Sequence, residues 1–117
     1  MKRIKVSEAT GAALDWLVAK CEGLEVAFTT NKEVIILREG VTDYFDPHRN
    51  WGWGGPIIDR ERIAIQFGPL WVAIHHKHLG HPSYGPTPLV AAMRCYCCAK
   101  LGEFADIPEE LCQQESN

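Results

Sequence analysis

The sequence predicts an α+β fold in which two helices pack on one face of a mainly antiparallel sheet of four or five strands. Segments with helical and extended periodicity follow one another as helix, two strands, long loop, two strands and helix, an order typical of this class. A chain of 117 residues has the usual size of one folded unit, so we expect a single domain over residues 1–117. The hydrophobic content of 46% and the charged content of 23% are those of a globular protein.

The N-terminal segment predicts a strand followed by a helix. Apolar and polar side chains alternate over residues 1–6, as in a half-buried strand. Residues 12–22 place apolar side chains at helical spacing. Ser7 or Thr10 can cap the start of this helix, and Gly23 can end it.

Four further β-rich runs are separated by one long irregular stretch. Residues 24–29 and 33–38 are joined by a connection short enough for a hairpin. Residues 63–67 and 70–74 form a second pair, joined through Gly-Pro. Residues 39–56 lack a sustained period and are rich in Gly, Asp, Pro and aromatic residues, which predicts a long loop of the kind that often carries function.

The clearest helix in the chain covers residues 88–101, after a second irregular stretch at residues 75–86. Thr87 is expected to cap this helix, a proline occupies its first position, and Gly102 follows its end. The polar tail after about residue 108 is expected to fray. Helices on one face of a sheet leave the other face bare, so we expect self-association into a homo-oligomer.

Composition excludes several classes of protein. The net charge of −3 and the isoelectric point of about 5.9 give no overall attraction to nucleic acid phosphates. The apolar runs, such as residues 34–37, are far too short to span a bilayer, and no secretory signal is visible. The cysteines are odd in number and lack the spacing of a disulfide framework, so we expect reduced thiols in a cytoplasmic protein. They are Cys21, Cys95, Cys97, Cys98 and Cys112.

The stretch NWGWGGPIIDRER, residues 50–62, is the strongest candidate for a ligand site. Its glycines argue against a helix. Tryptophan faces can stack on a base, and arginines can bind phosphates. A turn that begins at the proline would leave the N–H groups of Ile57 and Ile58 free for an anion. The candidate binding residues are Trp51, Trp53, Gly54, Gly55, Pro56, Arg60 and Arg62.

A structural alternative for this stretch stays open. Trp51 could plug the edge of the core, the Gly-Gly-Pro segment could be only a tight turn, and residues 59–62 could form a solvated charged face. Arg94, in the last helix, is an eighth candidate, which either extends to solvent over apolar neighbours or points at a ligand or a subunit partner. The ligand hypothesis requires both indoles to face an open, positively lined hollow.

The run HHKHLGH contains His75, His76, His78 and His81. If the preceding strand continues, His76 and His78 project on one side and could share a metal ion. A structural zinc site needs four ligands and Cys112 is distant, so we expect an exposed run that holds no metal, and no cofactor. No motif joins a nucleophile to a base, so we expect no enzyme activity.

Three blocks of the sequence resemble, in the same order, the NinX-like small proteins of tailed phages, from the accessory nin region of lambdoid phages. The blocks are KVSEATGAALDWLVAKCEG, NWGWGGPIIDRERIAI and YGPTPLVAAMRCYCCAKLGEFADIPEEL, and they cover most of the chain. The resemblance implies a phage accessory protein with one NinX-like domain. Trp53 stands where the family pattern has a polar residue, the histidine run is peculiar to this chain, and the CYCC segment is richer in thiols than the family pattern. Candidate residues on the shared motifs are Trp51, Gly54, Gly55, Pro56, Arg60 and Arg94.

These expectations combine into a non-enzymatic, homo-oligomeric phage protein that binds a small anionic, nucleotide-like ligand through residues 50–62. Phage accessory proteins of this size often act against the host, so sequestration of the ligand would counter a host defence. Two alternatives stay open. The first is a protein-binding module whose exposed tryptophans anchor a host or phage protein. The second is an accessory factor in phage DNA recombination or replication, whose DNA binding would be sensitive to salt.

Overall fold

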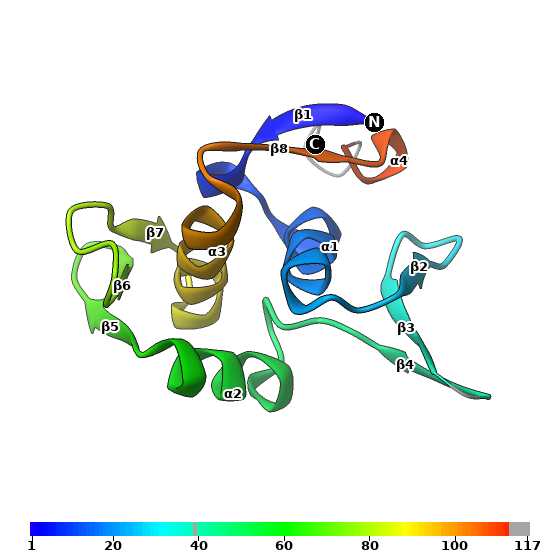
Figure 1. Cartoon of the computed structure of the whole chain (residues 1–117), viewed down its shortest axis with the longest axis horizontal. Helices are drawn as coiled ribbons and strands as arrows, with labels where there is room; N and C mark the ends of the chain where they lie inside the picture. Colours follow the sequence, from blue (N-terminus) through cyan, green and yellow to red (C-terminus); the bar gives the residue numbers. More distant parts are fainter. Residues whose placement is uncertain (39, 113–117) are drawn as a thin grey trace.

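The computed structural model describes residues 1–38 and 40–112, and within them it confirms the α+β class (Figure 1). In chain order the elements are β1 (Lys2–Lys5), the short 3-10 helix η1 (Val6–Glu8), α1 (Gly11–Glu22), β2 (Val26–Phe28), β3 (Val34–Arg38), β4 (Val41–Tyr44), α2 (Trp51–Glu61), β5 (Ile63–Phe67), β6 (Trp71–His75), β7 (Ser83–Gly85), α3 (Pro88–Leu101), β8 (Phe104–Ile107) and α4 (Glu109–Cys112).

The described strands form three small antiparallel sheets, so the expectation of one sheet with four or five strands is wrong. The sheet orders are β1-β8, β2-β3-β4 and β5-β6-β7. Both predicted hairpins are present, but each adds a short neighbouring strand, β4 or β7, instead of pairing with the other hairpin. The helices α1 and α3 lie between the two three-stranded sheets and keep them apart (Figure 1).

Helix α3 is the centre of the core. It packs on one face of the β5-β6-β7 sheet and against α1 on its other side (Figure 1). The covered sheet face carries Ala73 and Ser83, which are paired across β6 and β7 and are both buried. The opposite face carries Gln66 and Tyr84, which are exposed. One face of this sheet is therefore bare, but the other is covered by α3, with α1 on the far side of that helix, so the expectation that both helices pack on one sheet face is wrong.

Capping residues set the ends of the two predicted helices. The Thr87 side chain accepts a hydrogen bond from the Val90 N–H at 3.1 Å, which confirms the predicted start of α3. Gly23 ends α1 in the left-handed conformation with φ 71°, a backbone region that favours glycine. Gly102 follows the last residue of α3, as predicted.

Part of the C-terminal segment is ordered rather than frayed. The strand β8 pairs with β1, which sets Lys2 opposite Ile107, and α4 buries Leu111 completely. Apolar burial therefore fixes this segment as far as Cys112, and the rest of the predicted frayed tail, residues 113–117, lies outside the described residues. Within the described part, no helix has the length and the apolar character that crossing a membrane requires.

Candidate ligand site

Residues 51–61 form the helix α2, so the prediction of a glycine-rich loop is wrong for this stretch. The Asn50 side chain caps the helix by accepting a hydrogen bond from the Gly52 N–H at 2.8 Å. A Cβ at Gly54 would lie 2.6 Å from the Leu89 Cδ2 of α3 and 3.1 Å from the Pro47 carbonyl oxygen, so any larger residue would force these neighbours to shift. Ile57 is buried in the core. Tertiary packing thus overrides the poor helix propensity of glycine and proline.

The helix also removes the predicted phosphate turn. Helix α2 begins at Trp51, so Pro56 lies inside it and not at its start. The N–H groups of Ile57 and Ile58 therefore belong to the helix interior, where the preceding turn faces them, and the expectation that they are free is wrong. The N–H of Gly54 likewise donates to the Asn50 carbonyl at 3.0 Å.

The two tryptophans have different environments. Trp51 is 53% exposed. Trp53 is half-buried, packs edge-on against Phe45 with ring centroids 5.1 Å apart, and donates its indole N–H to the Tyr44 carbonyl at 3.0 Å. Positions two apart on a helix do not face each other, so the two rings cannot enclose one base between them.

Arg60 is held in a network that joins α1, α2 and α3. Its Nη1 and Nη2 contact the two carboxylate oxygens of Glu22 at 3.1 and 2.6 Å, and its Nε donates to Glu61 at 3.0 Å. Its Nη2 also donates to the Tyr96 hydroxyl at 3.2 Å. Burial alone would raise the pKa of Glu22, but hydrogen bonds from Arg60 and Tyr96 outweigh it and hold that pKa below its usual value. Arg60 would have to leave these partners to bind a phosphate.

The two other candidate arginines, Arg62 and Arg94, lie outside this network. Arg62 is exposed and ends α2 in the left-handed region with φ 52°. Arg94 is half-buried and donates to the carbonyls of Ala9 and Tyr84, both at 2.8 Å, so it joins the chain before α1 to β7. Burial lowers the pKa of the Arg94 guanidinium. Ligand binding by the eight predicted residues stays a prediction, and none of the eight lines either hollow described below.

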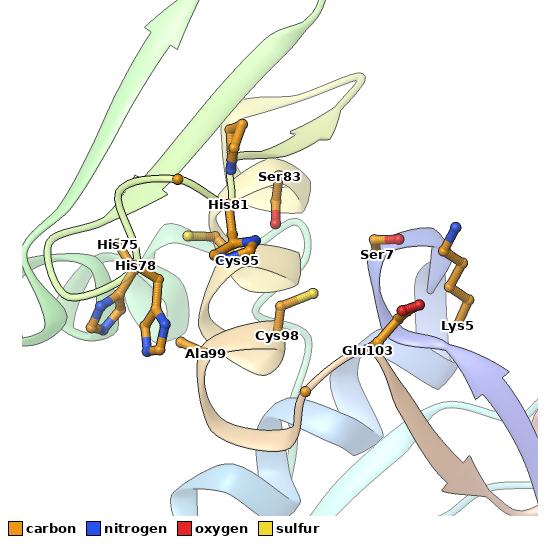
Figure 2. Close-up of a pocket in the computed structure, with 13 residues that line it drawn as sticks. Lys5, Ser7, His75, His78, His81, Ser83, Cys95, Cys98, Ala99 and Glu103 are labelled. Atoms are coloured by element: carbon orange, nitrogen blue, oxygen red, sulfur yellow. The ribbon is translucent and has the colours of Figure 1, made fainter.

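A cavity of about 740 Å³ lies between α3, the loop that joins β6 to β7, and the N-terminal segment (Figure 2). This volume is within the range of small-molecule sites, about 300–1,000 Å³. Figure 2 shows histidine, serine and cysteine side chains of α3 and the β6–β7 segment on one wall, with Lys5, Ser7 and Glu103 on the other. The lining residues are Lys5, Ser7, His75, His78, Gly80, His81, Pro82, Ser83, Cys95, Cys98, Ala99, Gly102 and Glu103.

The histidine run is divided by the end of β6. His75 is 4% exposed, so the prediction of an exposed run is wrong for this residue. Its Nδ1 accepts a hydrogen bond from the Lys77 N–H at 3.2 Å, which places the ring proton on Nε2, 3.0 Å from the Glu61 carboxylate. His76 lies in the turn that follows and donates from Nδ1 to the Glu61 carbonyl at 2.8 Å. Residues 75–76 thus form a link to α2.

The histidines and cysteines of the cavity do not form a metal site. Within the described residues, no group of three or more His, Cys, Asp or Glu side chains is placed to hold a metal ion. Burial raises the pKa of the Cys95 thiol to about 11. Burial also raises the pKa of Cys98, although a hydrogen bond with Ser83 offsets part of the increase. Both thiols are therefore protonated at neutral pH, so they add neutral, weakly polar groups to the cavity wall.

A second hollow, of about 180 Å³, contains a pair of residues that sequence reasoning missed. The Asp15 carboxylate on α1 lies 2.6 Å from His48 Nδ1 and accepts a further hydrogen bond from the His48 N–H at 3.0 Å. Asp15 is 3% exposed, and its burial raises its pKa, with the His48 contacts offsetting part of the increase. Within the part of the chain that the structure describes, no serine, threonine or cysteine lines this hollow, so no nucleophile lies beside the pair there. The separation of 33 residues hides the pair from local motifs.

Comparison with known proteins supports the phage resemblance. The family model described as bacteriophage P22, NinX matches residues 5–100. A search of curated proteins gave no match. The matched region contains both hollows apart from Gly102 and Glu103 at the rim of the larger one. Because the match covers most of the chain, the protein belongs to the phage P22 NinX family.

Proposed function

We propose that this protein acts in the host cytoplasm as a non-enzymatic phage accessory protein that binds a small anionic, nucleotide-like ligand. We further propose that sequestering this ligand counters a host defence. The cavity of about 740 Å³ is the observation that carries the proposal, because it is large enough for such a molecule and presents groups that bind anions. This cavity, and not residues 50–62, is the binding site that we propose.

The chemistry of the cavity suits a ligand with a charged end and a less polar body. The Lys5 ammonium and the imidazoles of His78 and His81 can donate to phosphate oxygens. The hydroxyls of Ser7 and Ser83 can donate and accept, as the sugar of a nucleotide requires. The protonated thiols, with Pro82 and Ala99, provide apolar contact for the rest of the molecule.

Calorimetry and thermal unfolding with inorganic phosphate and with nucleoside mono-, di- and triphosphates test this proposal. A ligand at about 100 times its dissociation constant stabilises a protein by about 2.7 kcal/mol. We expect Lys5→Ala and His81→Ala to weaken binding. The matched variants Trp51→Ala and Arg62→Ala, which change α2 residues outside the cavity, should bind as the natural protein does. The opposite pattern would move the site to α2, and no response to any anion would contradict the proposal.

A second candidate function, protein binding, is favoured by exposed apolar side chains at the turn between β5 and β6. Phe67 is 68% exposed and Leu70 is 53% exposed, and Phe67 contacts the Trp71 ring at a centroid distance of 4.9 Å. Clusters of this kind anchor protein interfaces. A second copy of the chain is the first partner to test, since the neighbouring sheet face is also bare. Sedimentation velocity should detect a homo-oligomer that the Phe67→Ser/Leu70→Ser double variant disrupts, and a monomer at all concentrations would exclude it.

A further inference from the structure

We infer that the cavity binds a doubly charged anion together with protons taken up by His78 and His81, so that pH sets its affinity. This inference rests on the proposed function, because it concerns the same cavity. Two observations support the inference. The first is the distribution of charge over the lining residues, and the second is that the three lining histidines of the β6–β7 segment differ in whether they make hydrogen bonds.

Without charged imidazoles, the lining has no net positive charge. Among the described residues that line the cavity, Lys5 is the only permanent cation and Glu103 is the only carboxylate. The Lys5 ammonium also lies 4.0 Å from the Glu8 carboxylate, on the η1 helix beside it. One positive and one negative group in a small volume give little attraction to a dianion. A second source of positive charge is therefore required.

Only two of the three lining histidines can supply that charge to a ligand. His75 is buried and has both ring nitrogens in use, one accepting from the Lys77 N–H and the other facing Glu61. His78 and His81 are exposed at the cavity, and across residues 1–38 and 40–112 neither imidazole makes a hydrogen bond or an ion pair. A protonated imidazole has two N–H donors, so each of these rings can donate to an anion.

Two thiols and one carboxylate near the cavity keep their charge state in the range where histidine changes. Burial holds the pKa of the Cys95 and Cys98 thiols above the usual value, so both stay neutral. Glu61, behind His75, has its pKa lowered by its hydrogen bond with His75 and stays ionised. Imidazole is the side chain whose charge normally changes between about pH 5 and pH 8. Proton uptake by His78 and His81 is therefore the change that would control binding.

Sulfate is the appropriate probe, because it stays doubly charged over this range while phosphate itself titrates. Isothermal titration calorimetry of the whole protein should show tighter sulfate binding at about pH 5.5 than at about pH 8. Unit charges about 4 Å apart in water interact by an amount equal to about a fivefold change in affinity. The double charge of sulfate doubles this energy, so one imidazolium predicts roughly a 25-fold change and two imidazoliums predict a larger one. Titration in two buffers of different ionisation enthalpy should also report proton uptake.

Three variants separate the possible explanations. The His78→Gln/His81→Gln double variant should bind sulfate weakly and with no dependence on pH. His76→Gln, which changes an exposed histidine outside the cavity lining, should keep the full dependence. Lys5→Ala should weaken binding at every pH and keep the slope. Sulfate binding that is independent of pH in the natural protein, or a dependence that survives in the double variant, would overturn the inference and leave the proposed function standing. Failure of sulfate and nucleotides to bind at any pH would refute both.

Discussion

Replacing His48 by alanine removes the partner of a carboxylate that has almost no access to water. The Asp15 side chain is 4% exposed and the His48 side chain 21% exposed. Leaving a buried charge without its hydrogen-bond partner costs about 3–5 kcal/mol, because that charge stays desolvated. The backbone N–H of residue 48 still reaches Asp15 Oδ1 in the variant, at 3.0 Å in the natural protein. We therefore expect a loss at the lower end, about 3 kcal/mol at pH 7.

The pH dependence of this loss identifies its cause. Burial raises the pKa of Asp15 above its ordinary 3.8. The stability that the protonated carboxyl contributes is thus fully present below pH 3.8 and is lost as pH rises through the folded-state pKa. Without His48 the folded-state pKa of Asp15 rises further. The deficit of the variant should be largest at neutral pH and should shrink as the solution is acidified toward pH 3.8.

Urea unfolding followed by tryptophan fluorescence measures this deficit at each pH. His81→Ala is the matched control, since it removes an exposed histidine and should change stability by less than about 0.5 kcal/mol. A His48→Ala deficit below about 1 kcal/mol at pH 7 would contradict the burial argument. A full deficit that stays constant on acidification would show that lost packing, and not the Asp15 charge, causes it.

Three further substitutions test other parts of the fold. In urea unfolding, Gly54→Ala should lower the free energy of unfolding by about 1–3 kcal/mol, because its Cβ would overlap a side chain of α3. Gly55→Ala, which has room for a Cβ, should raise it by up to about 1 kcal/mol. Equal stability of the two variants would contradict the packing role of Gly54. Arg60→Ala should lose about 1 kcal/mol at neutral pH, since half of its side chain is exposed. Because the pKa of Glu22 is lowered, this stability is present above pH 4.5 and lost as pH falls through the folded-state value. The stabilities of the natural protein and of Arg60→Ala should therefore converge in acid. A stability difference that does not change with pH would refute the ion-pair explanation. Thr87→Ala should lose about 1 kcal/mol and some helical circular dichroism, with Thr87→Ser retaining both.

The elements that the sequence predicted correctly are those whose signals are local. The last helix has a threonine cap, a proline in its first position and a glycine after its end, and α3 follows these limits. The hairpins of β2 with β3 and of β5 with β6 are also explained by short connections and β-rich runs. Each of these signals acts within a few residues. No tertiary contact is needed to interpret them.

The errors in the fold concern segments whose structure depends on distant residues. Glycine and proline disfavour a helix at α2, yet Gly54 allows α2 to pack closely on α3, and this packing stabilises the helix. The strand β8 exists because β1, about a hundred residues earlier, supplies its hydrogen-bond partners. The strand β4 has the same kind of origin, since it pairs along β3 in a segment that lacks periodicity. Propensity alone gives the wrong answer at these positions.

The candidate cavity was hidden for the same reason, although one part of it was visible. Its walls combine Lys5 and Ser7 from the N-terminal segment with Glu103 from beyond α3 and with the β6–β7 loop. The histidine run is visible in the sequence, but its spacing alone suggests only a shared metal ion. In the structure, these imidazoles can instead add positive charge to a cavity whose other charges balance. His75 and His76 contact Glu61, whereas His78 and His81 do not, so only the fold distinguishes the structural histidines from those available to a ligand.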